Sequence, residues 1–140
     1  MTVAIGIMQG RLSPPVPGRV QTFPWSSWDA EFERARDLGF QAIEWLFEAD
    51  GADRNPVWLE EGRKAIQEVS RETGVQVRSI CADYFMSCPF FRVSEAERLE
   101  SVSVLEELVE HAASIGVQTI LVPVLEGVEL RTRDEAQQLL

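Results

Sequence analysis

The chain has 140 residues, of which 45% are apolar and 26% charged, a composition typical of one soluble globular domain, residues 1–140. Its formal net charge of −10 argues against a nucleic-acid partner, because phosphate recognition needs a basic surface. With no long apolar run, no signal peptide and two cysteines expected as free thiols, Cys81 and Cys88, the sequence predicts a cytoplasmic protein without a membrane partner.

The first predicted strand, residues 3–8, is apolar throughout, which is typical of a parallel strand buried on both faces. A loop rich in proline and glycine follows at residues 9–24. It is long for a connection between a strand and a helix. Because long loops tend to carry functional residues, this loop is a candidate part of a binding site.

The first helix is predicted to begin at Ser26 or Ser27, with acidic residues in its first turn. Helical spacing predicts that it turns four side chains inward: Trp28, Phe32, Ala35 and Leu38. The second strand is predicted at residues 42–47.

The second helix is predicted to have Asn55 as its amino-terminal cap and Pro56 at its first helical position, and to end near Thr73. The side chains predicted to face inward are those of Leu59, Ile66 and Val69. The third strand is predicted at residues 75–82, and a loop rich in aromatic residues follows at 83–91.

Ser94 and Glu97 form the pattern of a capping box at the start of the third helix. The apolar stripe of this helix is predicted to contain seven residues: Leu99, Val102, Leu105, Leu108, Val109, Ala112 and Ile115. A fourth strand is predicted at residues 119–125. Thr132 and Glu135 form a second capping-box pattern, which predicts a short fourth helix that reaches Leu140.

A short motif that begins with Gly and has Gln at its third position occurs three times, starting at Gly39, Gly74 and Gly116. Each copy follows a predicted helix and opens a predicted strand, as expected because Gly ends a helix in the left-handed conformation without a Cβ penalty. The pattern predicts an α/β fold of four parallel βα units, the N-terminal half of a (βα)8 TIM barrel, truncated in the fourth helix. A complete four-stranded open sheet is the alternative.

Ligands of parallel βα folds bind at the carboxyl ends of the strands. The side chains at or just past the predicted strand ends are mostly polar: Gln9, Arg11, Glu44, Glu48, Cys81, Asp83, Tyr84 and Glu126. They suit a small polyhydroxylated or anionic ligand, with Arg11 as the expected anion partner. Structural roles stay open beside this interpretation, such as an ion pair of Arg11 with Glu48 or Asp83, or a solvated turn at Glu126.

The single histidine, His111, is predicted in the middle of a helix and away from any strand end, so no catalytic triad can be assembled around it. The sequence also lacks a Gly-x-Gly-x-x-Gly pattern and a phosphate-loop motif.

Residues 5–12, 39–45, 79–86 and 113–120 together resemble the first half of the xylose-isomerase-like TIM barrel superfamily. Within it the chain is most similar to the sugar phosphate isomerase/epimerase group, which includes ketose and pentulose-phosphate 3-epimerases. The resemblance extends over nearly the whole chain. The order and spacing of the segments carry it more than any single motif does.

The resemblance implies a metal-assisted proton transfer on a ketose or sugar phosphate, in which a divalent ion (Mn, Mg, Co or Zn) stabilises the developing oxyanion. Because the family's catalytic residues and metal ligands belong to strands five to eight, it implies no metal site in this chain alone. It implies instead a substrate-pocket wall made of five residues: Gln9, Arg11, Glu44, Asp83 and Glu126.

Two classes of function follow as expectations. The first is a sugar isomerase or epimerase that is active in the full-length barrel or with a complementing C-terminal half, this chain being inactive alone. The second is a non-catalytic half-barrel that self-associates, or a small open-sheet module that binds a ligand. A sugar or sugar phosphate is the expected small-molecule partner, and a homodimer would pair the free edges of the first and last strands.

Overall fold

Four parallel strands alternate with helices in the computed structural model, which describes residues 4–123. The elements in chain order are β1 (Gly6–Met8), α1 (Ala30–Asp37), β2 (Ala42–Leu46), the 3-10 helix η1 (Ala52–Arg54), α2 (Glu60–Thr73), β3 (Gln76–Cys81), α3 (Tyr84–Ser87), α4 (Glu95–Ser114) and β4 (Thr119–Leu121). The strands form one sheet in the order β1-β2-β3-β4. The predicted α/β fold of parallel βα units, a partial TIM barrel, is thereby confirmed.

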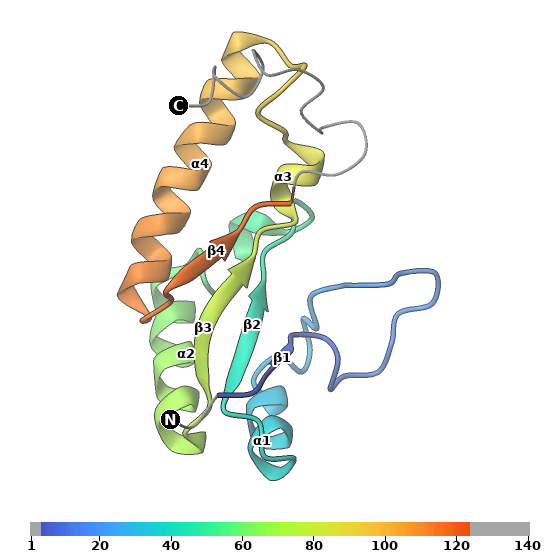
Figure 1. The fold of residues 1–140 in the computed structure, drawn as a ribbon, viewed down its shortest axis with the longest axis vertical. Helices are drawn as coiled ribbons and strands as arrows, with labels where there is room; N and C mark the ends of the chain where they lie inside the picture. Colours follow the sequence, from blue (N-terminus) through green and yellow to red (C-terminus); the bar gives the residue numbers. More distant parts are fainter. Residues whose placement is uncertain (1–3, 124–140) are drawn as a thin grey trace.

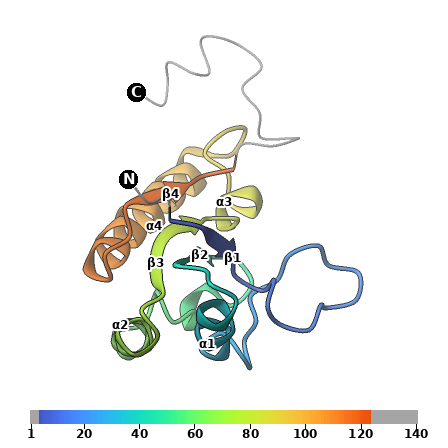
Figure 2. The same ribbon diagram turned by 60° about the horizontal axis from the view of Figure 1, so that its bottom comes forward.

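The sheet is curved, and helices α1, α2 and α4 lie along its outer side (Figures 1 and 2). Side chains on this outer face are buried, and the parallel register places Trp45 of β2 beside Ile80 of β3. The core includes Phe32 of α1, Ile66 of α2 and Leu108 of α4. The apolar face of each helix is therefore buried against the strands, which leaves the opposite, inner face of the sheet to carry polar side chains.

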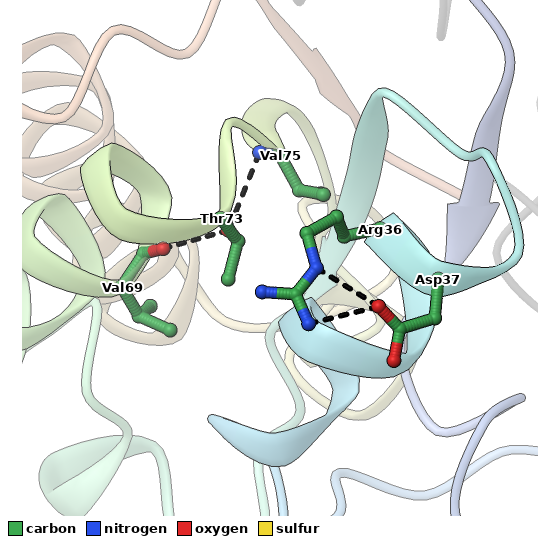
Figure 3. Close-up of polar contacts among 5 residues, drawn as sticks. All are labelled: Arg36, Asp37, Val69, Thr73 and Val75. Carbon is green, nitrogen blue, oxygen red and sulfur yellow. Dashed lines mark hydrogen bonds and ion pairs between the residues drawn. The ribbon is translucent and has the colours of Figure 1, made fainter.

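All three repeated glycines adopt the left-handed conformation, with φ values of 85°, 77° and 84° at Gly39, Gly74 and Gly116. A Cβ atom at any of them would meet nothing within 4 Å, so the backbone conformation and not lack of space requires glycine there. The predicted helix ends are confirmed. At the end of α2, the Thr73 hydroxyl donates to Val69 O over 2.7 Å and accepts from Val75 N over 3.3 Å (Figure 3).

The end of α1 lies close to this turn, and there Arg36 forms an ion pair with the adjacent Asp37 at 2.8 Å (Figure 3). Both side chains are largely exposed, so the pair contributes little to stability.

The first strand is shorter and less buried than predicted. It comprises Gly6–Met8, and Ile5 is 60% exposed rather than covered on both faces. The reason is its place at the edge of the sheet, where β2 is its single neighbour among the described residues. The predicted second and third strands contain β2 and β3 and extend past them by one residue at one or both ends.

Helix α1 begins at Ala30, several residues after the predicted start. Ser27 lies in a turn and shares a hydrogen bond of 2.8 Å with the hydroxyl of Ser13, while Asp29 caps the helix by accepting from Ala30 N over 2.8 Å. Phe32 and Ala35 are buried as predicted. Leu38 is exposed, because the helix ends before it and turns it to solvent.

Helix α2 begins at Glu60, so the prediction that Asn55 caps it is wrong. Asn55 is instead buried in the preceding turn, where its Oδ1 accepts from the Trp45 indole N–H over 2.9 Å and its Nδ2 donates to Leu46 O over 3.1 Å. Its polar groups are thus used to fasten the turn to β2. Leu59, predicted to face inward, is the exposed residue at the start of the helix, whereas Ile66 is buried and Val69 packs on the core.

The capping box of α4 is confirmed, with Ser94 Oγ accepting from Glu97 N over 3.3 Å and Glu97 Oε2 accepting from Ser94 N over 2.8 Å. Of the predicted apolar stripe, Leu108 and Ala112 are fully buried, but Leu99 and Val109 are exposed. The physical reason is that the stripe is wider than the face of α4 that meets the sheet. The remaining stripe residues are intermediate in exposure.

The fourth strand is observed at Thr119–Leu121, and a short helix, α3, lies within the predicted aromatic loop. Residues 122 and 123, predicted as strand, follow β4 without strand structure. Residues 124–125, the fourth helix with Thr132 and Glu135, and the candidate site residue Glu126 lie outside the described residues. Within residues 4–123, no helix has both the length and the apolar character needed to cross a membrane.

Candidate functional site

The carboxyl ends of β1, β2 and β3 meet at one edge of the sheet, and the long connection between β1 and α1 starts there (Figure 1). We call residues 9–29 the β1–α1 loop. Most of the predicted site residues lie on this loop or just after the ends of β2 and β3.

Gln9 follows β1 directly and is 1% exposed. Its backbone N–H donates to Glu44 O over 3.0 Å, and its side-chain Oε1 accepts from Leu46 N over 3.1 Å, so the side chain reaches across the end of β2. Its Nε2 is buried without a hydrogen-bond partner among the described residues. A buried donor left unsatisfied costs about 1–3 kcal/mol, so this atom is suited to a ligand oxygen.

Glu44 alternates with the core residues Ile43 and Trp45 and therefore lies on the inner face of the sheet. A bulge in β3 leaves Arg78 without a partner on β2 and sets Ser79 opposite Glu44. The Ser79 hydroxyl donates to Glu44 Oε1 over 3.0 Å. The two side chains form a half-buried polar pair that faces the interior of the curve.

Asp83 lies just past β3 and accepts two hydrogen bonds. Its Oδ2 accepts from Gln21 Nε2 over 2.8 Å, and its Oδ1 accepts from the Cys81 thiol over 3.2 Å. Burial, and then the Asp83 carboxylate, raise the pKa of Cys81 to about 12. This thiol is therefore neutral at physiological pH and serves as a hydrogen-bond donor, not a nucleophile. Cys81 and Cys88 are both free, as predicted.

The turn that carries Arg11 is fixed by a buried carboxylate. Glu31 of α1 is 1% exposed, and its two oxygens accept from Gly10 N over 2.8 Å and from Leu12 N over 3.0 Å. The exposed Arg11 guanidinium donates to Val20 O over 3.0 Å. Among the described residues it forms no ion pair with Glu48 or Asp83, so the structure does not bear out that alternative role.

Glu48 fastens the far end of the β1–α1 loop to the end of β2. Its Oε2 accepts from Phe23 N over 2.7 Å. Burial raises the pKa of Glu48, although the Phe23 N–H and the positive charge of Arg19 act in the opposite direction. Glu48 is thus a carboxylate whose ionised form is partly destabilised by its surroundings.

Tyr84 and His111 have packing roles. The Tyr84 ring stacks on Phe47 with a centroid distance of 5.5 Å, and burial raises the pKa of its hydroxyl to about 12. His111 lies in the last turn of α4 and not in mid-helix as predicted, against Trp58 at a ring-centroid distance of 5.1 Å, and burial lowers its pKa. His111 belongs to a helix and not to the chain at a strand end, which agrees with the packing interpretation.

Sequence reasoning missed Gln21 and Glu31. Gln21 lies in a loop without periodicity, and its approach to Asp83 joins residues 62 positions apart. In the sequence Glu31 is one of the acidic residues expected in a first helical turn, and this pattern gives no reason to expect burial. In residues 4–123, no group of three or more His, Cys, Asp or Glu side chains is arranged to hold a metal ion.

Parallel strands with outer helices and polar side chains at the strand ends define a protein of the (βα)-barrel class. The Xylose isomerase-like TIM barrel family matches residues 32–139, and the chain belongs to this family. It is 27% identical over 94 residues to the L-ribulose-5-phosphate 3-epimerase UlaE of Salmonella paratyphi B and equally to that of Salmonella heidelberg.

These alignments cover 66% of this chain and 33% of each relative, so the chain spans about a third of the length of the curated relatives it matches. The crystal structure of 3-keto-D-glucoside 4-epimerase, YcjR, from E. coli in its apo form has a similar fold, with a TM-score of 0.64 and 18% sequence identity. That similarity covers 96% of this chain and 43% of the other.

Proposed function

We propose that this chain forms part of a sugar epimerase or isomerase barrel and supplies one wall of its sugar-phosphate pocket. The proposal is supported by the family, by the name of the UlaE relatives and by the polar inner edge of the sheet. The single observation that carries it is the buried, unpartnered Gln9 Nε2 at the end of β1. A sugar oxygen would satisfy this donor.

Each predicted pocket residue has a binding task in this proposal. Gln9 donates to a sugar oxygen, and the Glu44–Ser79 pair accepts and donates hydrogen bonds to hydroxyl groups on the inner face. Arg11 attracts the phosphate, and Asp83 orders the end of β3. Glu126, outside the described residues, remains a proposed member of the wall.

The finer part of the proposal is the reaction, a proton transfer next to a carbonyl group with the help of a divalent metal ion (Mn, Mg, Co or Zn). The residues of the described part of the chain do not fit such an ion, since they contain no suitable cluster of ligands. The proposal therefore assigns binding and orientation to these residues and places no step of the proton transfer on them.

Ligand-detected NMR with L-ribulose 5-phosphate tests the proposal. We expect Gln9→Ala to weaken binding by about tenfold, because a neutral hydrogen bond to a buried donor is lost. Gln118→Ala is the control, since Gln118 is exposed and lies before β4, at the opposite end of the sheet. Absence of binding to the unmodified chain, or equal losses in both variants, would contradict the pocket.

Arg11→Ala provides a second test of the same pocket. We expect it to weaken binding of L-ribulose 5-phosphate but not of L-ribulose, because the guanidinium would contact only the phosphate. The melting temperature should stay nearly unchanged, since Arg11 is exposed and bonded to one loop carbonyl. A large fall in melting temperature with unchanged binding would make Arg11 a structural residue.

The alternative is a non-catalytic half-barrel that self-associates, or an open-sheet module that only binds a ligand. The exposed apolar residues at the sheet edges, Ile5 and Leu121, are the observation from which self-association is inferred. Epimerase activity on L-ribulose 5-phosphate distinguishes the two candidates when this chain is assayed together with a complementing C-terminal half, with and without added divalent metal. Turnover would exclude a role limited to binding.

A further inference from the structure

The β1–α1 loop brings one more polar side chain, Gln21, to the end of β3. We propose that Gln21 is a specificity-determining contact for a sugar hydroxyl group and that Asp83 is the residue that positions it. This inference rests on the proposed function and adds to the pocket a residue of the long loop after β1 that no motif singled out.

The hydrogen bonds at the end of β3 fix the orientation of the Gln21 amide. Its Nε2 donates to Asp83 Oδ2 over 2.8 Å and lies 4.0 Å from Cys81 Sγ. The reverse orientation would set the amide oxygen against a carboxylate oxygen, which is repulsive. The Oε1 atom of Gln21 therefore points away from Asp83, and it receives no hydrogen bond from any described residue.

Asp83 holds this cluster together through both of its carboxylate oxygens. One oxygen accepts from Gln21 and the other accepts from the neutral Cys81 thiol. Gln21 Oε1 is the acceptor of the cluster that has no partner among the described residues, and we assign the ligand contact to it. Asp83 acts through it, as a positioning residue.

The cluster lies on the same face of the sheet as the candidate sugar site. Cys81 follows Ser79 by two residues on β3, and side chains two apart in a strand share a face. The register pairs Ser79 with Glu44 and Cys81 with Leu46, so the Gln21 amide is placed one step nearer the carboxyl edge than the Glu44–Ser79 pair.

The loop holds Gln21 in place before any ligand binds. Two residues further on, Phe23 is 1% exposed and its N–H donates to Glu48 over 2.7 Å. The side chain of Phe23 packs on Trp45 of β2 with a centroid distance of 5.3 Å. A preorganised amide loses little freedom on binding, so it discriminates well between a ligand that carries the matching hydroxyl and one that does not.

Binding of L-ribulose 5-phosphate to three forms of the chain tests the contact. We expect Gln21→Ala to weaken binding by about tenfold, and Val20→Ala, its 86% exposed neighbour, to leave binding within about twofold. The melting temperatures of both variants should match that of the unmodified chain. Unchanged binding in Gln21→Ala would overturn the inference and leave the proposed function standing, whereas absence of binding to the unmodified chain would overturn both.

The positioning role of Asp83 has a readout that needs no ligand. We expect the side-chain amide NMR signals of Gln21 to shift, and their hydrogen exchange to accelerate, in Asp83→Asn. The signals of the exposed Gln118 serve as the internal control in the same spectra. Unchanged Gln21 signals in a folded Asp83→Asn variant would show that Asp83 does not position this amide.

Discussion

At the scale of single residues, buried polar side chains bonded to the backbone shape the site more than its exposed charges do. Gln9, Glu31 and Asn55 are each almost fully buried, and each bonds a strand or loop backbone. A buried polar group is stable only where such bonds are made. These residues therefore fix the backbone at the strand ends, and Gln9 alone among them retains an unpartnered donor.

Glu31→Ala should destabilise the chain, because it leaves the N–H groups of Gly10 and Leu12 without their carboxylate acceptor. We expect a loss of about 2–3 kcal/mol in the free energy of unfolding, typical of hydrogen bonds to a charged group. Urea unfolding followed by tryptophan fluorescence measures it. Glu33→Ala, an exposed change on the same helix, is the control, and similar stabilities of the two variants would show that Glu31 is dispensable.

Glu48 should make stability depend on pH. Its pKa is raised in the folded state, mainly by burial, so the folded chain binds this proton more tightly than the unfolded chain, whose value is near 4.5. The contribution of Glu48 to stability is therefore fully present below that value and is lost as pH rises through the folded pKa.

The matched variant is Glu48→Gln, which can still accept from Phe23 N. We expect the free energy of unfolding of the unmodified chain, relative to Glu48→Gln, to decrease as the pH rises above the unfolded-state value of 4.5. Urea titrations at several pH values measure this difference. A difference that is constant, or that increases with pH, would mean that the pKa of Glu48 is not raised.

At the scale of elements, the helix ends and the start of α4 were predictable, whereas the starts of α1 and α2 were not. The three repeated glycines end their helices in the left-handed conformation, and this ending depends only on residues that are close in the sequence. Ser27 and Asn55, predicted at the starts of α1 and α2, instead form side-chain hydrogen bonds with Ser13 and Trp45. Both helices therefore begin further along the chain. Local capping preferences give way where tertiary partners compete for the same polar group.

Substitutions at Gly74 test whether the left-handed backbone conformation requires glycine at the end of α2. A side chain at Gly74 meets open space, but its φ of 77° disfavours residues with a Cβ atom. We expect Gly74→Val to lower the free energy of unfolding by about 1–2 kcal/mol or more and Gly74→Asn to lower it by less, because Asn tolerates the left-handed region. Thermal unfolding measures both, and equal losses would point to a steric cause instead.

At the scale of the whole molecule, the described residues form a curved sheet whose two outer strands each have one neighbour. β1 pairs with β2, and β4 pairs with β3. Leu121 of β4 is 50% exposed, and the inner face carries the polar groups of the candidate site. Exposed strand edges are templates for pairing with another chain.

We therefore expect the 140-residue chain to self-associate at micromolar concentration, with Leu121→Lys reducing the association because an edge lysine opposes pairing. Leu38→Lys, an exposed change at the end of α1, is the control. Light scattering measures the mass of each form. A stable, monodisperse monomer that unfolds cooperatively would favour the open-sheet alternative over a half-barrel that pairs its edges.

The serial order of strands and helices, the glycine helix ends and the capping box of α4 were all predictable from the sequence. Each follows from hydrophobic periodicity or turn chemistry within a short stretch of chain. It also singled out Gln9, because residues just past a strand end are easily located in parallel folds, and Glu44, because a carboxylate within an apolar strand stands out.

Which polar groups meet depends on the packed fold and was not predictable from the sequence. The bulge at Arg78 sets Ser79 opposite Glu44, and the β1–α1 loop brings Gln21 to Asp83. Register and loop placement depend on contacts between residues that are tens of positions apart, and no local pattern encodes them. The physical reason is that burial and hydrogen-bond partners are properties of the packed fold, whereas periodicity is a property of the chain.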